Sequence, residues 1–257
     1  MNSHIYILIL NWNGKNLLKP CLDSILDIDY DNYTTLVIDN NSTDGSSKMI
    51  KNRFPNVEYL QLEKNYGFAG GYNRCFDYLR DKDPEYILLL NNDTEIEPDI
   101  LSSFIKAAKH YGNQNIFGGK IFYHHNPKKI WYAGGHVNLK YGRIYHRGIH
   151  KNDSEKYSFN SITDYVTGCC LFTTWDVIEK IQGFDDQFNM YGEDVDLCLR
   201  AKRKDVQCFY WPDAKLLHHV SASVGGNWSP KKIISKFKSL FRLWIKHFLF
   251  KSSHDHG

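Results

Sequence analysis

The 257-residue sequence lacks the glycine-rich signatures of the most familiar nucleotide-binding folds. No GxGxxG follows the first apolar run, where "NWNGKN" holds a single glycine, and this disfavours a dinucleotide-dependent dehydrogenase. No GxxxxGK[ST] is present, which excludes a P-loop nucleotidase. Any nucleotide site must therefore be built from other residues.

Cysteine motifs and long apolar runs are also missing. The six cysteines form no CxxC pair and no zinc spacing, so we interpret them as reduced thiols, with the vicinal Cys169 and Cys170 as small core side chains. No apolar run approaches the roughly 18–20 residues of a membrane span. The N-terminal "HIYILIL" is too short and too strand-like for a signal peptide. These absences predict a cytoplasmic protein.

Acidic residues are absent between Ala214 and His254, a stretch that carries eight basic residues. The net charge of +3 therefore combines a mildly acidic main body with a basic tail. Any attraction to polyanions belongs to that tail, and we expect no nucleic-acid partner.

Short β-rich apolar runs alternate with segments of helical period. The runs are Ile5–Leu10, Thr35–Asp39, Val57–Leu62 and Tyr86–Leu90, and Gly67–Leu79 is one of the intervening helices. This alternation predicts an α/β fold with a mostly parallel, Rossmann-like central sheet flanked by helices. Ligands bind outside the carboxyl ends of such strands, and here every one of those ends is polar.

Beyond these strands the pattern is less regular. Residues 116–170 are predicted to form hairpins and loops, followed by helices at Thr174–Ile181 and Glu193–Lys204 and a strand at Val206–Tyr210. We assign residues 1–225 to one catalytic domain and residues 226–257 to a basic amphipathic C-terminal helix and tail.

The C-terminal helix is expected over Pro230–Phe250. Its apolar stripe comprises Ile233, Ile234, Phe237, Leu240, Phe241, Trp244, Ile245 and Phe248, and Lys232, Lys236, Arg242 and Lys246 lie largely off it. The pattern suits a helix on an anionic membrane surface, or equally a helix docked on its own domain or on a second copy in a homodimer.

Asp39 and Asp93 end two of the predicted strands. A carboxylate at the position of Asp39 can accept hydrogen bonds from a ribose or a base, although an Asx turn with a helix cap explains "NSTDGS" as well. Asp93 is placed to hold Mg²⁺ or Mn²⁺ with a diphosphate, since such sites need few protein carboxylates. The alternative is that Asp93 caps a helix beginning near Pro98.

Three acids, Glu193, Asp194 and Asp196, occupy the first turn of a predicted helix, where the helix dipole alone favours them. Asp194 would project at the helix start and could take a proton from a hydroxyl. His218 and His219 follow a strand, and an imidazole there could be a metal ligand or an ordinary buried histidine; we expect only one of the two to reach a site.

Six ordered motifs resemble the inverting glycosyltransferases of family 2, in the rhamnosyltransferase-like branch. They run from residue 4 to about 223: "ILNWNG", "VIDNNSTDGS", "EKNYGFAGGYNRC", "LLLNND", "GFDDQFNMYGEDVDLCLRA" and "HHVSAS". The resemblance implies a GT-A fold and a metal-dependent transfer of a sugar, rhamnose being favoured, from a UDP- or dTDP-linked donor. The implied acceptor is a hydroxyl of a cell-surface polysaccharide or lipid-linked glycan, at the inner face of the membrane.

The resemblance also implies residue roles. Asp194 is the expected catalytic base, and Asp93 with His218 the expected ligands of Mn²⁺ or Mg²⁺, while Glu193 and Gly168 lie on the acceptor side. Asn91 stands where the family's DXD motif often has its first Asp. The remaining donor-side positions are Asn11, Asn13, Asp39, Asn65, Gly70, Gly71, Asn91, Asn92 and Asp93.

Two other functions remain open from the sequence. A sugar-1-phosphate nucleotidyltransferase would carry a glycine-rich, basic loop after the first strand, and "NWNGKNLLKP" offers one glycine and two lysines. A non-catalytic sugar-nucleotide-binding protein is disfavoured because Asp93 and Asp194 are both present.

Overall fold

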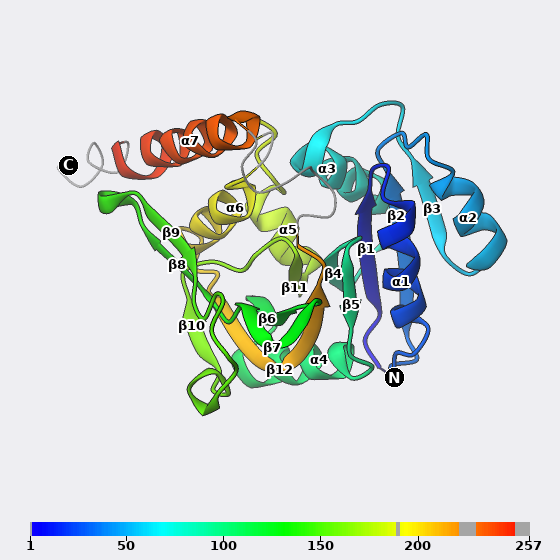
Figure 1. Ribbon diagram of the computed structural model, residues 1–257, viewed down its shortest axis with the longest axis horizontal. Coiled ribbons are helices and arrows are strands. Elements are labelled where there is room, and N and C mark those ends of the chain that lie inside the picture. The colour runs from blue at the N-terminus through cyan, green and yellow to red at the C-terminus, as the bar shows by residue number, and fades with distance from the viewer. Residues whose placement is uncertain (1, 189–190, 221–229, 250–257) are drawn as a thin grey trace.

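We describe the protein from a computed structural model, which covers residues 2–188, 191–220 and 230–249, with side chains except at 230–236, 248 and 249. Figure 1 shows strands and helices in alternation along the first half of the chain. The strands are β1 (Ile5–Asn11), β2 (Tyr33–Asp39), β3 (Glu58–Gln61), β4 (Tyr86–Asn91), β5 (Thr94–Ile96), β6 (Ile116–Tyr123), β7 (Asn126–Tyr132), β8 (Gly135–Asn138), β9 (Arg143–His146), β10 (Ser161–Thr163), β11 (Cys170–Thr174) and β12 (Cys208–His218). The helices are α1 (Lys15–Ile25), α2 (Ser46–Arg53), α3 (Gly67–Leu79), α4 (Ile100–Tyr111), α5 (Trp175–Ile181), α6 (Glu193–Lys202) and α7 (Pro230–Trp244).

Ten of these strands form one sheet in the order β10-β12-β6-β11-β4-β1-β2-β3, with β5 and β7 paired to β12 and β6. Strands β4, β1, β2 and β3 are mutually parallel, and their register aligns Asn11 with Asp39 and Leu10 with Asn91. The predicted α/β class is confirmed. Because the strands run in one direction, their polar ends meet at one edge of the sheet.

Both faces of the sheet are buried, which explains the near-continuous apolar strands. Residues Ile5, Ile7 and Ile9 of β1 face the core that also holds α1, α2 and α4. Tyr6 and Leu8 face the opposite core, shared with α3, α5 and α6. The two cores sandwich the sheet between helices.

The middle of the chain does form hairpins, as predicted, but it also contributes to the central sheet. Strand β6 pairs in parallel with β12 and leads into the antiparallel β7, while β8 and β9 form a separate ribbon. Strand β11 is inserted antiparallel between β4 and β6. The sheet therefore changes from a parallel half to a mixed half at β11.

Helix α7 packs against the domain through a face that the sequence stripe did not predict. Ser239 and Leu243 of α7 are buried, as is His247 in the π-helical turn Ile245–Leu249 that continues the helix, whereas Phe237 and Phe241 are 69% and 61% exposed. The predicted stripe also includes Ile233, Ile234 and Phe248, whose side chains lie outside the described residues, as do the 225/226 boundary and the tail from residue 250. Arg242 contacts the Gln187 carbonyl and Lys246 contacts the Asp185 carboxylate, so this part of the helix is docked on its own domain, one of the arrangements that the sequence left open.

The six cysteines are free and buried, as predicted. Within the described part of the chain, no helix has the length and apolar character needed to cross a membrane.

Candidate active site

Polar side chains link the turns that follow β1, β2 and β4. The Asn11 amide donates to Ser42 Oγ (3.2 Å) and accepts from Asn92 Nδ2 (2.8 Å), and Asn13 Oδ1 accepts from the Thr43 amide (2.8 Å). A side chain on Gly14 would meet Asn92 at 2.2 Å, so glycine is required for this close approach. Asn11, Asn13 and Asn92 thus belong to one hydrogen-bond network at the edge of the sheet, and Asn92 links the end of β4 to the end of β1.

Asp39 is fully buried within this network. Its Oδ1 accepts from the Ser42 amide (3.0 Å) and hydroxyl, and its Oδ2 accepts from Tyr59 Oη. Both carboxylate oxygens are therefore engaged by the protein. In this arrangement Asp39 organises the turn after β2, and a base or ribose could reach it only by displacing one of these partners.

The predicted donor-side residues of α3 have local structural roles. Asn65 is exposed, and its Oδ1 accepts from the Gly67 amide (2.8 Å) at the helix start. Gly70 and Gly71 are buried, and a Cβ on Gly71 would lie 2.6 Å from Leu10 Cδ1. The glycines allow α3 to approach β1, which keeps the helix start near the site.

Asp93 and His218 come together from two distant parts of the chain. Asp93 lies in the turn between β4 and β5, and His218 ends β12. Asp93 Oδ1 and His218 Nε2 are 3.1 Å apart, and their side chains are only 6% and 8% exposed. The alternative that Asp93 caps α4 is excluded, since Asp99 occupies that position.

This pair has the properties of a divalent-metal site. Burial would raise the pKa of Asp93, but the adjacent His218 outweighs it, so the pKa of the carboxyl is lowered and the group stays ionised. Asp93 Oδ1 and His218 Nδ1 are buried and make no hydrogen bond of good geometry within the described residues. A buried carboxylate oxygen left without a well-aligned donor beside an imidazole fits Mn²⁺ or Mg²⁺.

Asp194 lies in the first turn of α6, after Gly192, whose φ of 85° suits glycine at this position. Its Oδ2 accepts from the Gly168 amide (3.1 Å) and its Oδ1 from the Val195 amide (2.8 Å). Burial raises the pKa of Asp194 despite these two donors. Burial and the charge of Asp194 likewise raise the pKa of Glu193, whose Oε2 has no partner within the described residues. A carboxylate with a raised pKa is a stronger general base.

The segment from Thr167 to Cys169 joins the two acidic positions. The Gly168 amide holds Asp194, and the Cys169 carbonyl accepts from the Asn91 amide (3.0 Å), two residues before Asp93. The pKa of the Cys169 thiol is raised by its burial and by the charges of both Asp93 and Asp194. The segment 167–169 therefore contacts both Asp194 and the strand end that leads to Asp93.

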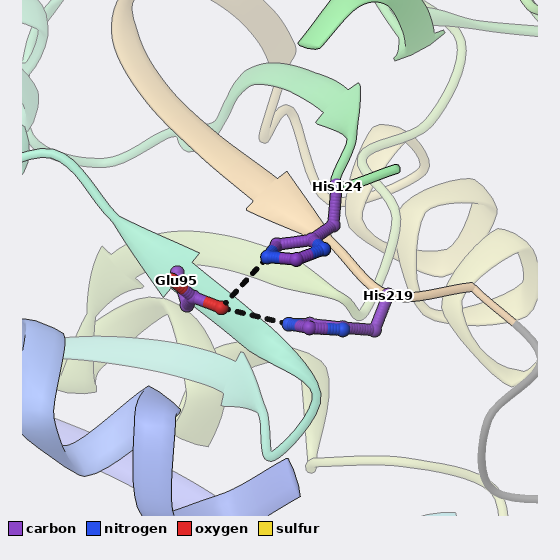
Figure 2. A group of neighbouring side chains, drawn as sticks. All are labelled: Glu95, His124 and His219. Atoms are coloured by element: carbon purple, nitrogen blue, oxygen red, sulfur yellow. Dashed lines mark hydrogen bonds and ion pairs between the residues drawn. The ribbon is translucent and has the colours of Figure 1, made fainter. Parts of the chain in front are cut away.

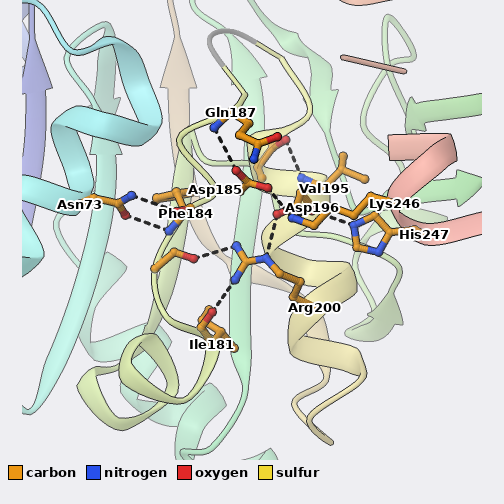
Figure 3. A network of polar contacts seen from close by, with 12 residues as sticks. Asn73, Ile181, Phe184, Asp185, Gln187, Val195, Asp196, Arg200, Lys246 and His247 are labelled. Carbon is orange, nitrogen blue, oxygen red and sulfur yellow. Dashed lines mark hydrogen bonds and ion pairs between the residues drawn. The ribbon is translucent and has the colours of Figure 1, made fainter. Parts of the chain in front are cut away.

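A buried polar cluster joins the first turn of α6, which also carries Asp194, to the C-terminal helix (Figure 3). The fully buried Asp196 accepts from Arg200 Nε (2.8 Å), His247 Nε2 (2.7 Å) and Lys246 Nζ (2.7 Å). Burial opposes ionisation, but these donors outweigh it and lower the pKa of Asp196 to about 2. Lys246 also contacts Asp185 (2.5 Å). Helix α6, which carries Asp194, is thus held by residues about 50 positions later in the chain.

Several residues of this region were not identified from the sequence. Trp131 packs edge-on against His218, with ring centroids 4.4 Å apart, and burial lowers the pKa of the nearby His146 to about 4. Only one of His218 and His219 was expected to reach a site; His218 contacts Asp93, and His219 contacts Glu95. The polar ends of the parallel strands could be recognised in the sequence, but the strands that pair antiparallel within the same sheet could not.

Comparison with known proteins identifies related sequences. The profile described as glycosyl transferase family 2 matches residues 6–181. The rhamnosyltransferase WbbL of Escherichia coli (strain K12) is 26% identical over 227 residues, which cover 84% of this chain and 83% of that protein. The N-acetylglucosaminyl-diphospho-decaprenol L-rhamnosyltransferase of Mycobacterium tuberculosis is 25% identical over 211 residues, covering 75% of this chain and 68% of that protein.

Among solved structures, GalNAc-T7 with UDP, GalNAc and Mn²⁺ superposes with a TM-score of 0.73 at 13% identity. The match covers 94% of this chain but only 47% of that one, so this chain spans about half of the solved structure's length. The likeness confirms the predicted GT-A fold.

Proposed function

Since the chain belongs to glycosyl transferase family 2, and is a glycosyltransferase, we propose that it is a metal-dependent inverting enzyme that transfers a sugar from a nucleotide-diphosphate donor to a glycan hydroxyl. The observation that carries the proposal is the segment 167–169, which donates to Asp194 through the Gly168 amide and accepts, through the Cys169 carbonyl, from the Asn91 amide two residues before Asp93. The proposed transfer requires one group that holds the metal–diphosphate and another that accepts a proton. Both groups must face one site.

Asp93 and His218 would hold Mn²⁺ or Mg²⁺. The ion would supply charge neutralisation at the departing diphosphate. The buried Oδ1 of Asp93, which accepts no well-formed hydrogen bond from the described residues, supports this assignment, as does the lowered pKa that keeps the carboxyl ionised. The amides of Asn11, Asn13 and Asn92 hold the adjacent turns in position, and the side chain of Asn91 adds no charge.

Asp194 would accept the proton of the acceptor hydroxyl as that oxygen attacks the anomeric carbon from the face opposite the diphosphate. The Gly168 and Val195 amides orient the carboxylate. Burial reduces its hydration and raises its pKa, which increases its strength as a base. Glu193 lies next to it, and the charge of Asp194 together with burial raises the pKa of Glu193 to about 8. The aromatic side chain of Phe68 lies against Gly168 and helps to exclude water.

For the substrates, we propose rhamnose on a UDP or dTDP carrier and a lipid-linked glycan acceptor. The rhamnosyltransferases named above support the sugar, and the name of the mycobacterial relative supports an acceptor on a polyprenyl diphosphate. The exposed Phe237 and Phe241, with the exposed Lys238 on the same helix, suit contact with an anionic lipid surface. Serine at both phenylalanines should reduce sedimentation with anionic vesicles; undiminished binding would contradict the contact.

The decisive experiment compares the wild-type protein with Asp194→Asn. Release of nucleoside diphosphate is measured across a panel of donors with Mn²⁺ and a lipid-linked acceptor. Transfer by the variant should fall by about 10²–10⁴-fold, because proton transfer contributes a factor of that order. Donor affinity, measured by calorimetry, should change little. Equal loss of both would exclude the base role, and no release from any donor by the wild-type protein would favour a non-catalytic binding protein.

A further inference from the structure

Three side chains that the proposed reaction does not use, those of Glu95, His124 and His219, converge on one point (Figure 2). Glu95 belongs to β5, His124 follows β6 and His219 follows β12. The Nε2 atoms of His124 and His219 lie 3.2 Å and 2.8 Å from the same oxygen, Glu95 Oε1. The two imidazole rings stack with centroids 3.7 Å apart and an interplanar angle of 20°. One carboxylate oxygen therefore faces two imidazole nitrogens.

The backbone fixes this arrangement. Leu217 pairs with Glu95, the His219 amide donates to the Asp93 carbonyl (2.9 Å), and the His124 amide donates to the His218 carbonyl (3.0 Å). Successive residues of an extended chain point in opposite directions. Accordingly, His218 contacts Asp93 and Trp131, whereas His219 contacts Glu95 and His124. The cluster has its own neighbours and is distinct from the pair assigned to the donor.

We propose that Glu95, His124 and His219 form a second divalent-cation site, suited to Zn²⁺ or a similar borderline ion. Two imidazole nitrogens and one carboxylate oxygen are typical zinc ligands, whereas Mg²⁺ prefers a shell of oxygens. In a tetrahedral zinc site, ligand atoms about 2.0–2.1 Å from the metal lie roughly 3.3 Å from one another. The two carboxylate–imidazole separations lie close to that value, so small side-chain rotations suffice.

The surroundings also allow an ion to enter. The side chains of Glu95, His124 and His219 are 30%, 39% and 21% exposed, which leaves a route from solvent and a fourth position for water. A bound ion would connect β5, the β6–β7 turn and the end of β12. Because these segments carry or adjoin Asp93 and His218, the ion would hold the frame of the donor site without entering the reaction.

The competing explanation is that the two histidines simply donate N–H groups to Glu95. Each Nε2 can face the carboxylate either as an N–H donor or as a lone pair directed to a cation, and these two arrangements have nearly the same heavy-atom positions. Direct metal binding distinguishes them.

The test uses the full-length chain without an affinity tag, after treatment with a chelator. Co²⁺ is titrated while its visible absorption is recorded, Zn²⁺ is used to displace it, and thermal unfolding is followed with and without Zn²⁺. The wild-type protein should take up one Co²⁺ at this site with the intense visible absorption of a tetrahedral Co²⁺ centre, and Zn²⁺ should raise the unfolding temperature. His124→Ala and Glu95→Gln should each weaken binding by at least about tenfold, since a lost ligand costs no less than a lost outer-shell partner.

Two controls separate this site from others. His125→Ala removes the neighbouring, exposed histidine, and His218→Ala removes the inner histidine; both should retain the Co²⁺ spectrum. Glu95→Gln keeps the size of the side chain, so it reports on binding even if His124→Ala folds poorly. Unchanged affinity in both Glu95→Gln and His124→Ala, or loss of the spectrum only in His218→Ala, would overturn the proposal.

Discussion

The clamp between α6 and the C-terminal helix makes Asp196→Asn the most quantitative test of this structure. Asp196 is fully buried and accepts hydrogen bonds from Arg200, Lys246 and His247. Its pKa is lowered from an ordinary 3.8 to about 2. At about 1.4 kcal/mol per pKa unit, ionisation of this carboxyl contributes roughly 2 kcal/mol to stability near neutral pH.

The sign of the pH dependence follows from the direction of the shift. A carboxyl whose folded-state pKa is depressed contributes stability that is present above its unfolded-state pKa. That stability is lost as the pH falls toward the folded-state value. For Asp196 the window therefore lies between about 4 and 2. The asparagine side chain of the variant cannot ionise, so the difference between wild type and variant should be constant above about pH 5 and shrink below about pH 4.

The measurement is urea unfolding at a series of pH values from about 7 to about 3. Near neutral pH, Asp196→Asn should lower the unfolding free energy by about 2–4 kcal/mol, because Arg200 also loses its carboxylate partner and Lys246 loses one of its two. Asp205→Asn, at an exposed aspartate just beyond α6, should change it by less than about 0.5 kcal/mol. A loss in Asp196→Asn that is equal at both ends of the pH series would refute the reasoning, as would no loss at all.

Two further predictions concern the base. Asp194→Asn removes the charge that, together with burial, raises the pKa of Glu193 to about 8, so the pKa of Glu193, followed by NMR of its side-chain carboxyl carbon, should fall; an unchanged pKa would mean that the two carboxyls do not interact. Gly168→Ala would bring a Cβ to 2.8 Å from a ring atom of Phe68, and we expect a loss of about 1–3 kcal/mol in urea unfolding together with slower transfer; wild-type stability would show that the ring moves freely.

The parallel half of the sheet and the polar ends of its strands could be predicted from the sequence. Apolar runs of strand length, separated by segments of helical period, give the element type and order directly, and Gly67–Leu79 agrees with α3 at both ends. The carboxylates Asp93 and Asp194 were identified for the same reason, because strand ends and helix starts have defined places at a ligand site. These features depend on local sequence.

The mixed half was harder to predict because its partners are distant in sequence. Strand β12 was expected to stop at Tyr210, but it continues to His218 through Pro212 and a register shift between Trp211 and Lys215. A proline and a bulge interrupt the sequence pattern without ending the strand. Likewise, the burial of Asp39 depends on Tyr59 of the neighbouring strand.

In the C-terminal helix, contacts with the rest of the domain decide which of two similar faces is buried. Hydrophobic periodicity favoured a stripe containing Phe237 and Phe241, yet the helix packs through Leu243 and His247. The reason is Asp196, a buried carboxylate that requires cationic or N–H partners and finds them in Lys246 and His247. The polar requirement of α6 therefore sets the rotation of α7, and the apolar side chains left outside become available to another surface.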